Sequence, residues 1–60
     1  MIVVHTYEVW DITRDNWVRM PIKGTEERIK ESKGRIVPGS AEEVAPSDVD
    51  EYGLYRPTAR

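Results

Sequence analysis

The sequence predicts a small α+β fold of β–β–α–β order: a three-stranded antiparallel sheet in strand order 2-1-3, with one short helix on one face and an extended, acidic and aromatic C-terminal tail. Three observations predict it. Residues 2–12 and 17–22 are rich in β-branched and aromatic side chains and flank a polar turn. A segment with helix-capping residues follows them, and then a short apolar run. A chain of 60 residues has room for one such domain, which we place at residues 1–45, with the tail at 46–60 either partly disordered or packed on the sheet.

The first two strands are expected to form a β-hairpin. Asp and Asn in the polar turn tolerate the left-handed backbone that hairpin loops require. A four-residue loop pairs Ile12 with Trp17 and puts Val9 on the face of Val18. A three-residue loop pairs Thr13 with Trp17 and exchanges the two faces of the first strand. Both registers stay open, and in each of them at least one tryptophan lies on the face away from Val18.

One short helix is predicted over residues 26–33. Before it, Pro21 removes a backbone donor and so ends the second strand or confines it to an edge. Thr25 is a good N-cap, and two glutamates suit the positive end of the helix. Gly34 suits the C-terminus because glycine readily takes the left-handed conformation there. Ile29 is the only large apolar residue of the segment, so the helix is expected to dock on the sheet through this side chain.

A third strand is expected over residues 35–37, and it bends or ends at Pro38. Residues 41–44 either continue this strand after the bend or form a helical turn, and both options stay open. The tail opens with an acidic segment and closes with aromatic residues around Gly53. Because a single helix covers only one face of the sheet, the other face is left for the tail or for another molecule.

Composition and motifs argue against catalytic and metal-binding chemistry. The chain has no cysteine, which rules out disulfides, thiolate nucleophiles and cysteine-based metal sites. His5 is the single histidine, and strand alternation separates it from Glu8, so these side chains do not make a closed metal site. Residues 48–53 match the opening of a calcium loop, but Ala59 stands at the twelfth position, where a glutamate is required. We therefore expect no enzymatic activity and no cofactor.

Targeting signals and net charge indicate where the protein is located and which partners its overall charge attracts. No apolar run approaches the ~18 residues of a membrane span, and the N-terminus lacks the pattern of a signal peptide. We therefore expect a cytoplasmic protein. The net charge of −2 gives no overall attraction to nucleic acid or to anionic lipid. The length and the order of elements resemble those of short bacterial proteins, and no motif ties the chain to one family.

The sheet face that the helix leaves uncovered, together with the aromatic tail, is the strongest functional candidate. Tryptophan and arginine are the residue types that most often anchor protein interfaces. The candidate partner-binding residues are Trp10, Trp17, Arg19, Tyr52, Leu54 and Tyr55. The sequence thus predicts a protein-interaction or regulatory module that binds a protein partner or a second copy of itself. The competing interpretation, in which the tail covers this face within one molecule, stays open.

Two other binding functions compete with this one. Residues 14–37 hold seven of the nine lysines and arginines, so Trp17, Arg19 and the helix cations offer a surface on which nucleic-acid bases stack. Acidic residues interleave the helix cations, which makes nucleic acid the less favoured partner. Residues 42–51 hold five acidic residues and no cation. This segment resembles a phosphate backbone in charge, in the manner of small phage-encoded inhibitors of nucleic-acid-binding proteins.

Overall fold

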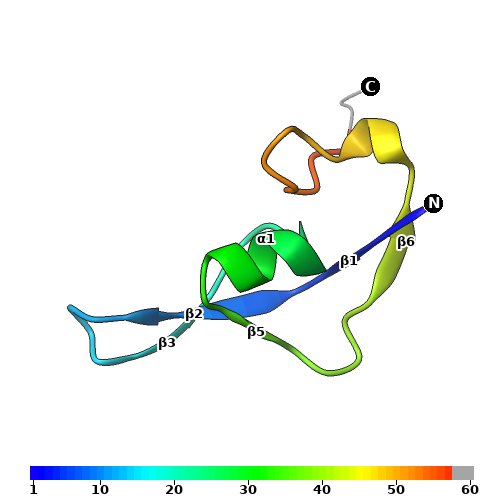
Figure 1. Ribbon diagram of the computed structural model, residues 1–60. Coiled ribbons are helices and arrows are strands. Elements are labelled where there is room, and N and C mark those ends of the chain that lie inside the picture. Colours follow the sequence, from blue (N-terminus) through cyan, green and yellow to red (C-terminus); the bar gives the residue numbers. More distant parts are fainter. Residues whose placement is uncertain (58–60) are drawn as a thin grey trace.

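The computed structural model describes residues 1–57, and it contains two small antiparallel sheets that are joined through the N-terminal strands (Figure 1). The strands are β1 (Ile2–His5), β2 (Tyr7–Asp11), β3 (Asn16–Arg19), β4 (Gly24–Thr25), β5 (Arg35–Ile36) and β6 (Glu42–Val44), and the helices are α1 (Glu26–Glu31) and the 3-10 helix η1 (Pro46–Asp48). The first sheet has the order β4-β1-β6, and the second has the order β3-β2-β5. The α+β class is confirmed, whereas the prediction of a single sheet is wrong.

The chain passes from one sheet to the other at Thr6, in the middle of the segment predicted as one strand. Thr6 N–H donates a hydrogen bond to the Ser40 hydroxyl (3.0 Å), and Val37 N–H donates to Thr6 C=O (2.9 Å). The Ser40 hydroxyl donates in turn to Val37 C=O (2.6 Å). These hydrogen bonds hold the loop between β5 and β6 against Thr6, where the chain passes from one sheet to the other. The predicted order 2-1-3 is found only in the second sheet, where β2 lies between β3 and β5.

The β2–β3 hairpin has a four-residue turn that closes one residue earlier than the sequence predicted. The paired residues are Glu8 and Arg19, Val9 and Val18, Trp10 and Trp17, and Asp11 and Asn16. The Asp11 carboxylate accepts hydrogen bonds from the N–H groups of Thr13 (2.9 Å) and Arg14 (3.2 Å), so this side chain fixes where the turn starts. Neither predicted register is present. Val9 nevertheless shares the face of Val18, as the four-residue loop required, and both tryptophans lie on the other face.

The helix α1 begins where it was predicted and ends two residues earlier. Thr25 is its N-cap, and the Thr25 hydroxyl accepts a hydrogen bond from Arg28 N–H (3.3 Å). Beyond the C-terminus, Lys33 takes the left-handed conformation (φ 57°) that the sequence assigned to Gly34. Gly34 is needed for another reason, because a Cβ at this position would lie 2.8 Å from the Glu8 carbonyl oxygen. The glycine therefore lets the chain leave the helix in close contact with β2.

The core lies between α1 and the two sheets. Its buried apolar side chains are Val4, Tyr7, Ile29 and Val44, and the most accessible of them is 5% exposed. They come from β1, β2, α1 and β6, so one small cluster joins both sheets to the helix. Ile29 is 3% exposed, which confirms that the helix docks through this side chain. Burial of one such side chain stabilises the fold by roughly 1.5–3 kcal/mol.

The C-terminal segment folds back onto the first sheet, so the prediction of an extended tail is wrong. Thr25 N–H donates to Gly53 C=O (2.9 Å), and Tyr55 N–H donates to Lys23 C=O (2.8 Å). Leu54 forms a bridge to β4 between these two bonds. The tail thereby covers the free edge of β4. In Figure 1 it lies above α1, whereas the β2–β3 hairpin lies below the helix and projects to the left.

Residues 41–44 neither continue β5 nor form a helical turn, which were the two options that the sequence left open. Residues 42–44 form β6, which pairs with β1 in the first sheet and places Val44 opposite Ile2. The chain reverses before β6 at Gly39, whose φ of 78° is accessible to glycine at little cost. The strand therefore belongs to the other sheet and does not continue β5.

Candidate functional site

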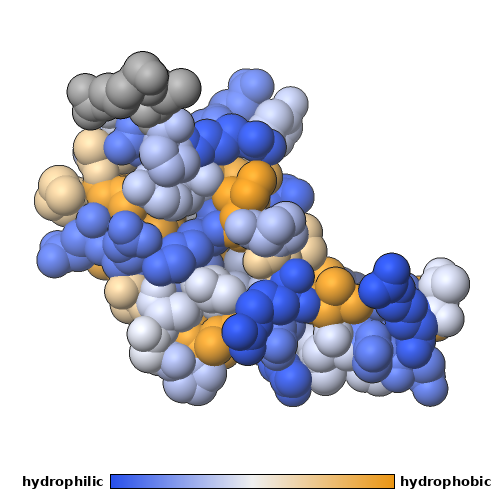
Figure 2. Space-filling view, turned by 180° about the vertical axis from the view of Figure 1, so that it is seen from behind, coloured by the Kyte–Doolittle hydropathy of each residue, from blue (hydrophilic) through white to orange (hydrophobic). Residues whose placement is uncertain are grey.

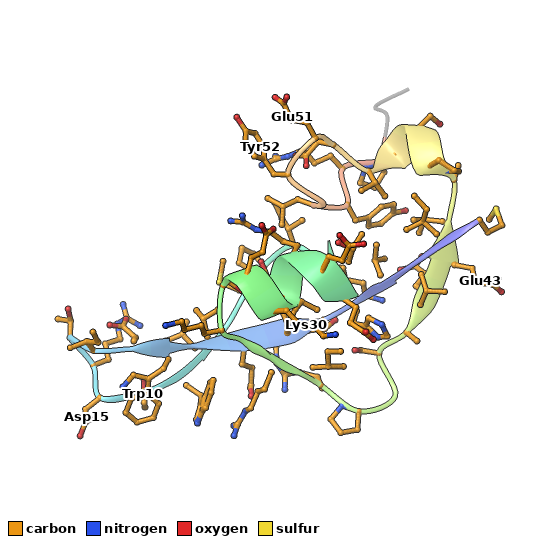
Figure 3. All side chains as sticks on the ribbon, in the orientation of Figure 1. Trp10, Asp15, Lys30, Glu43, Glu51 and Tyr52 are labelled. Carbon is orange, nitrogen blue, oxygen red and sulfur yellow. The ribbon has the colours of Figure 1, made fainter. Side chains whose placement is uncertain are left out.

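The exposed side chains of the second sheet gather on the face that points away from α1. Strand alternation places there Glu8 and Trp10 of β2, Trp17 and Arg19 of β3, and Arg35 of β5. These five residues are called the tryptophan face below. In Figure 3 the side chain of Trp10 lies beneath the hairpin, on the side opposite to the helix. The structure thus brings together the three site residues that the sequence predicted in the two strands.

The two tryptophans form a cross-strand pair. Trp10 and Trp17 lie directly opposite each other, their ring centroids are 5.6 Å apart, and their planes meet at 79° in an edge-to-face arrangement. The Arg35 guanidinium carbon lies 4.2 Å from the centroid of Trp17. Trp10 is nevertheless 47% exposed and Trp17 is 36% exposed. The rings therefore hold each other in place and still present apolar area to solvent.

Glu8 lies at the centre of this face and binds both arginines. Its Oε1 atom lies 2.9 Å from Arg35 Nε, and its Oε2 atom lies 3.6 Å from Arg19 Nη2. The Glu8 side chain is 19% exposed, less than either arginine. Exposed ion pairs of this kind add little stability, about 0–1 kcal/mol each. Their main effect here is to orient Arg35 against the Trp17 ring.

An open hollow of about 500 Å³ borders the tryptophan face. It is lined by Glu8, Arg19 and Arg35 on one side and by Ile36, Val37 and Pro38 on the other. Figure 2 views the molecule from behind, where the projecting hairpin is on the right and its surface mixes hydrophobic with strongly hydrophilic residues. The region therefore combines a hollow, two exposed indoles and paired charges.

The tail aromatics do not join the tryptophan face. Leu54 and Tyr55 are half-buried, because Leu54 forms a bridge to β4 and Tyr55 forms one to Val49 within the tail. Tyr52 is 61% exposed on the far side of α1 (Figure 3). The tail therefore does not cover the two tryptophans within the molecule. Sequence reasoning missed Glu8 and Arg35 as members of the site. The available signal was their opposite charge on two strands that the predicted order 2-1-3 already placed side by side.

The basic residues invoked for nucleic-acid binding are divided between separate surfaces. The helix contacts β1 and β4 of the first sheet and β5 of the second, and it lies on the side away from the tryptophan face. Arg28 is only partly exposed, and Lys30 forms an ion pair with Glu26 (3.5 Å). Lys23 lies 3.0 Å from Glu42 Oε1 and donates to Ser40 C=O. These cations therefore do not extend the surface formed by the tryptophans and Arg19.

Asp50 of the acidic segment is held by hydrogen bonds and an ion pair within the tail. The Asp50 carboxylate accepts hydrogen bonds from the N–H groups of Tyr52 (2.9 Å) and Leu54 (3.0 Å), and its second oxygen lies 2.8 Å from Arg56 Nε. The hydrogen bond from Leu54 N–H lowers the pKa of Asp50 below its usual value, and the contacts with Arg56 and Tyr52 N–H act in the same direction. Within residues 1–57, no three His, Cys, Asp or Glu side chains are grouped so that they would hold a metal ion.

A second hollow of about 400 Å³ lies between α1 and the tail. It is lined by Thr25, Glu27, Arg28, Glu31 and residues 50–53. The Nε atom of Arg28 is buried near this hollow, and no hydrogen-bond partner faces it among the residues that the structure describes. Four carboxylates line the same space. Because the lining is acidic and the arginine is partly buried, we assign no ligand to this hollow.

The part of the chain described by the structure contains no helix that is both long and apolar enough to cross a membrane. No family model, no curated protein and no solved structure matches this chain.

Proposed function

We propose that this chain is a non-enzymatic protein-binding module whose contact surface is the tryptophan face. The observation that carries the proposal is the exposed Trp10–Trp17 pair, which Arg35 and Glu8 hold in a fixed arrangement. Tryptophan and arginine dominate the binding energy of protein interfaces, chiefly where they form a compact centre. Because the rings are already ordered, this chain loses less side-chain entropy when a partner binds to them.

A nucleic-acid-binding function is the second candidate. The Arg35–Trp17 contact supports it, because bases stack on exposed aromatic rings beside cations. Glu8 argues against it, since this carboxylate neutralises part of the charge of Arg19 and Arg35 and repels phosphate. The helix cations lie on the other side of the sheet and do not compensate. A protein partner fits the surface better.

The test is affinity capture from the native cell with the full chain and two matched variants. Trp17→Ser removes one ring of the tryptophan face, whereas Tyr52→Ser removes an exposed aromatic from the far side of the helix. We expect a protein partner that the Tyr52→Ser variant retains and the Trp17→Ser variant loses. Far-UV circular dichroism of each variant confirms that the fold is kept.

The salt dependence of the captured complex separates the two candidates. Contacts between apolar side chains respond weakly to salt, whereas affinity for nucleic acid falls by roughly 10³–10⁵ between 50 and 200 mM salt when several phosphates are contacted. Retention of the partner at high salt supports the protein-binding module. Equal loss of the partner with both variants, or nucleic acid that is released by salt, would contradict it.

A further inference from the structure

The edge of β3 is the longest sheet edge that the described residues leave open. The tail covers the edge of β4, as shown by the hydrogen bond from Thr25 N–H to Gly53 C=O. β6 carries two adjacent glutamates, and β5 has only two residues. Charged side chains and a very short length protect an edge strand against pairing with another chain. β3 has four residues, and Arg19 is its only charged residue.

The register of the hairpin shows which backbone groups of β3 face outward. Met20 N–H donates to Tyr7 C=O (2.9 Å), so Met20 and, by alternation, Val18 direct their backbone groups toward β2. Trp17 and Arg19 then direct their N–H and C=O groups away from β2. Because β3 pairs only with β2 within residues 1–57, these four groups are open to another strand.

We infer that β3 pairs antiparallel with β3 of a second copy, with Trp17 of each chain opposite Arg19 of the other. The inference rests on the proposed role of the tryptophan face and names its partner. A two-fold arrangement that uses all four open groups has Val18 on the axis and brings Trp17 and Arg19 together twice. The alternative that places Arg19 opposite Arg19 sets like charges against each other, which is destabilising.

The chemistry of the strand is self-complementary in this one register. Directly opposed residues of an antiparallel pair share a face, so each Trp17 ring meets a guanidinium from the other chain on the tryptophan face. The Trp17 ring already receives Arg35 of its own chain at 4.2 Å. The second sheet of one copy and the second sheet of the other then form one six-stranded sheet, on which the exposed tryptophans of both copies are contiguous. An aromatic and a cation at i and i+2 on an open edge thus specify a second copy as the occupant.

Engineered disulfides test the register directly, because the chain has no cysteine of its own. Val18 lies on the predicted axis in a non-hydrogen-bonded pair, where opposite Cα atoms are about 4.5 Å apart, within the disulfide range of about 4.4–6.8 Å. V18C is therefore expected to cross-link two chains in a thiol–disulfide buffer. I12C is the matched control, since Ile12 is 86% exposed in the turn of the same hairpin and outside the predicted pair. We expect V18C to form at least about tenfold more disulfide dimer than I12C, because pairing raises the effective thiol concentration.

Sedimentation of the unmodified full chain between about 10 μM and about 1 mM supplies the second measurement. We expect a mass that rises toward that of a dimer, and we expect Arg19→Glu to abolish the rise. Support requires both this rise and preferential cross-linking of V18C; absence of either overturns the inference. Failure here is distinguishable from failure of the proposed function, because a chain that stays monomeric and still loses a captured protein through Trp17→Ser retains its protein-binding role.

Discussion

Replacement of Gly34 by alanine is expected to push β5 away from β2 and to disturb the tryptophan face. The new Cβ would lie 2.8 Å from the Glu8 carbonyl oxygen, 3.1 Å from Tyr7 Cδ2 and 3.3 Å from Val9 Cγ1. The first contact is with backbone and is not relieved by a side-chain rotation. Since Arg35 follows directly and pairs with Glu8, a shift here also loosens the guanidinium from the Trp17 ring.

The size of the effect follows from the limited stability of a short chain. Forcing an extra methyl group into a packed site costs about 1–3 kcal/mol. A domain of 60 residues has roughly 3–9 kcal/mol of stability in total. Gly34→Ala therefore removes a substantial fraction of it. The adjacent change Lys33→Gly is the matched control, and it should raise the stability by about 0.5–1 kcal/mol, because Lys33 has a φ of 57° that glycine adopts without steric penalty.

Urea unfolding, followed by far-UV circular dichroism and by tryptophan fluorescence, measures both variants. We expect the midpoint to fall for Gly34→Ala and to rise for Lys33→Gly, and the fluorescence of folded Gly34→Ala to differ from that of the parent chain. If the helix extended to Lys33, as the sequence predicted, Lys33→Gly would instead lower the stability, since a glycine inside a helix costs about 1 kcal/mol. An unchanged midpoint for Gly34→Ala, or a lower one for Lys33→Gly, would refute the reasoning.

Three further variants test other parts of the structure. Val4→Asp should unfold the chain because Val4 is fully buried, whereas Val18→Asp should lower the urea midpoint by less because Val18 is only half-buried; a larger effect at Val18 would contradict the described core. The pKa of Asp50 is lowered in the folded chain, so its contribution to stability is fully present above the usual carboxyl pKa and is lost as the pH falls through the lowered value. Amide exchange at Leu54, measured relative to an unstructured peptide, should accordingly accelerate in that acidic range in the parent chain, whereas Asp50→Asn, whose side chain does not titrate, should show no such acceleration; identical pH profiles would contradict this assignment. Glu8→Gln should lower the free energy of unfolding by less than about 1 kcal/mol while changing tryptophan fluorescence, and no fluorescence change would mean that Glu8 does not orient the arginine.

The parts of the fold that were predictable from the sequence are those with local causes. Thr25 caps the helix through a residue three positions away, and β3 ends at Arg19, two residues before Pro21, which was expected to end the strand or confine it to an edge. The break at Thr6 has a distant cause, because its partner Ser40 lies 34 residues further along the chain. β4 and β6 have only two and three residues, too few to show a periodic pattern. The two outer strands of the first sheet, β4-β1-β6, therefore had no local signature in the sequence.

The candidate site follows the same division. Trp17 and Arg19 were identified because residue type and strand alternation place them on one face, whereas Trp10 shared that face in only one of the two open registers, and the structure places it there. Arg35 was missed although the predicted order placed its strand beside the first strand, because strand order alone does not show that its guanidinium lies over the ring of Trp17, on a strand with which β5 does not pair. The expectation that the tail lies near this face was reasonable for an aromatic segment. It failed because main-chain hydrogen bonds to residues 23–25 direct the tail to β4 instead.

The β2–β3 hairpin is the part of the described fold that its own chain covers least. The tail closes the β4 edge through residues 53–55, and the buried side chains of four elements hold the first sheet to the helix. The hairpin has no such cover on its outer face, and even Val9 and Val18 on its inner face are only half-buried. A chain of this length has few further apolar residues with which to close it. Any partner that covers the tryptophan face or extends β3 therefore adds burial where the monomer lacks it, and it stabilises the folded chain through binding.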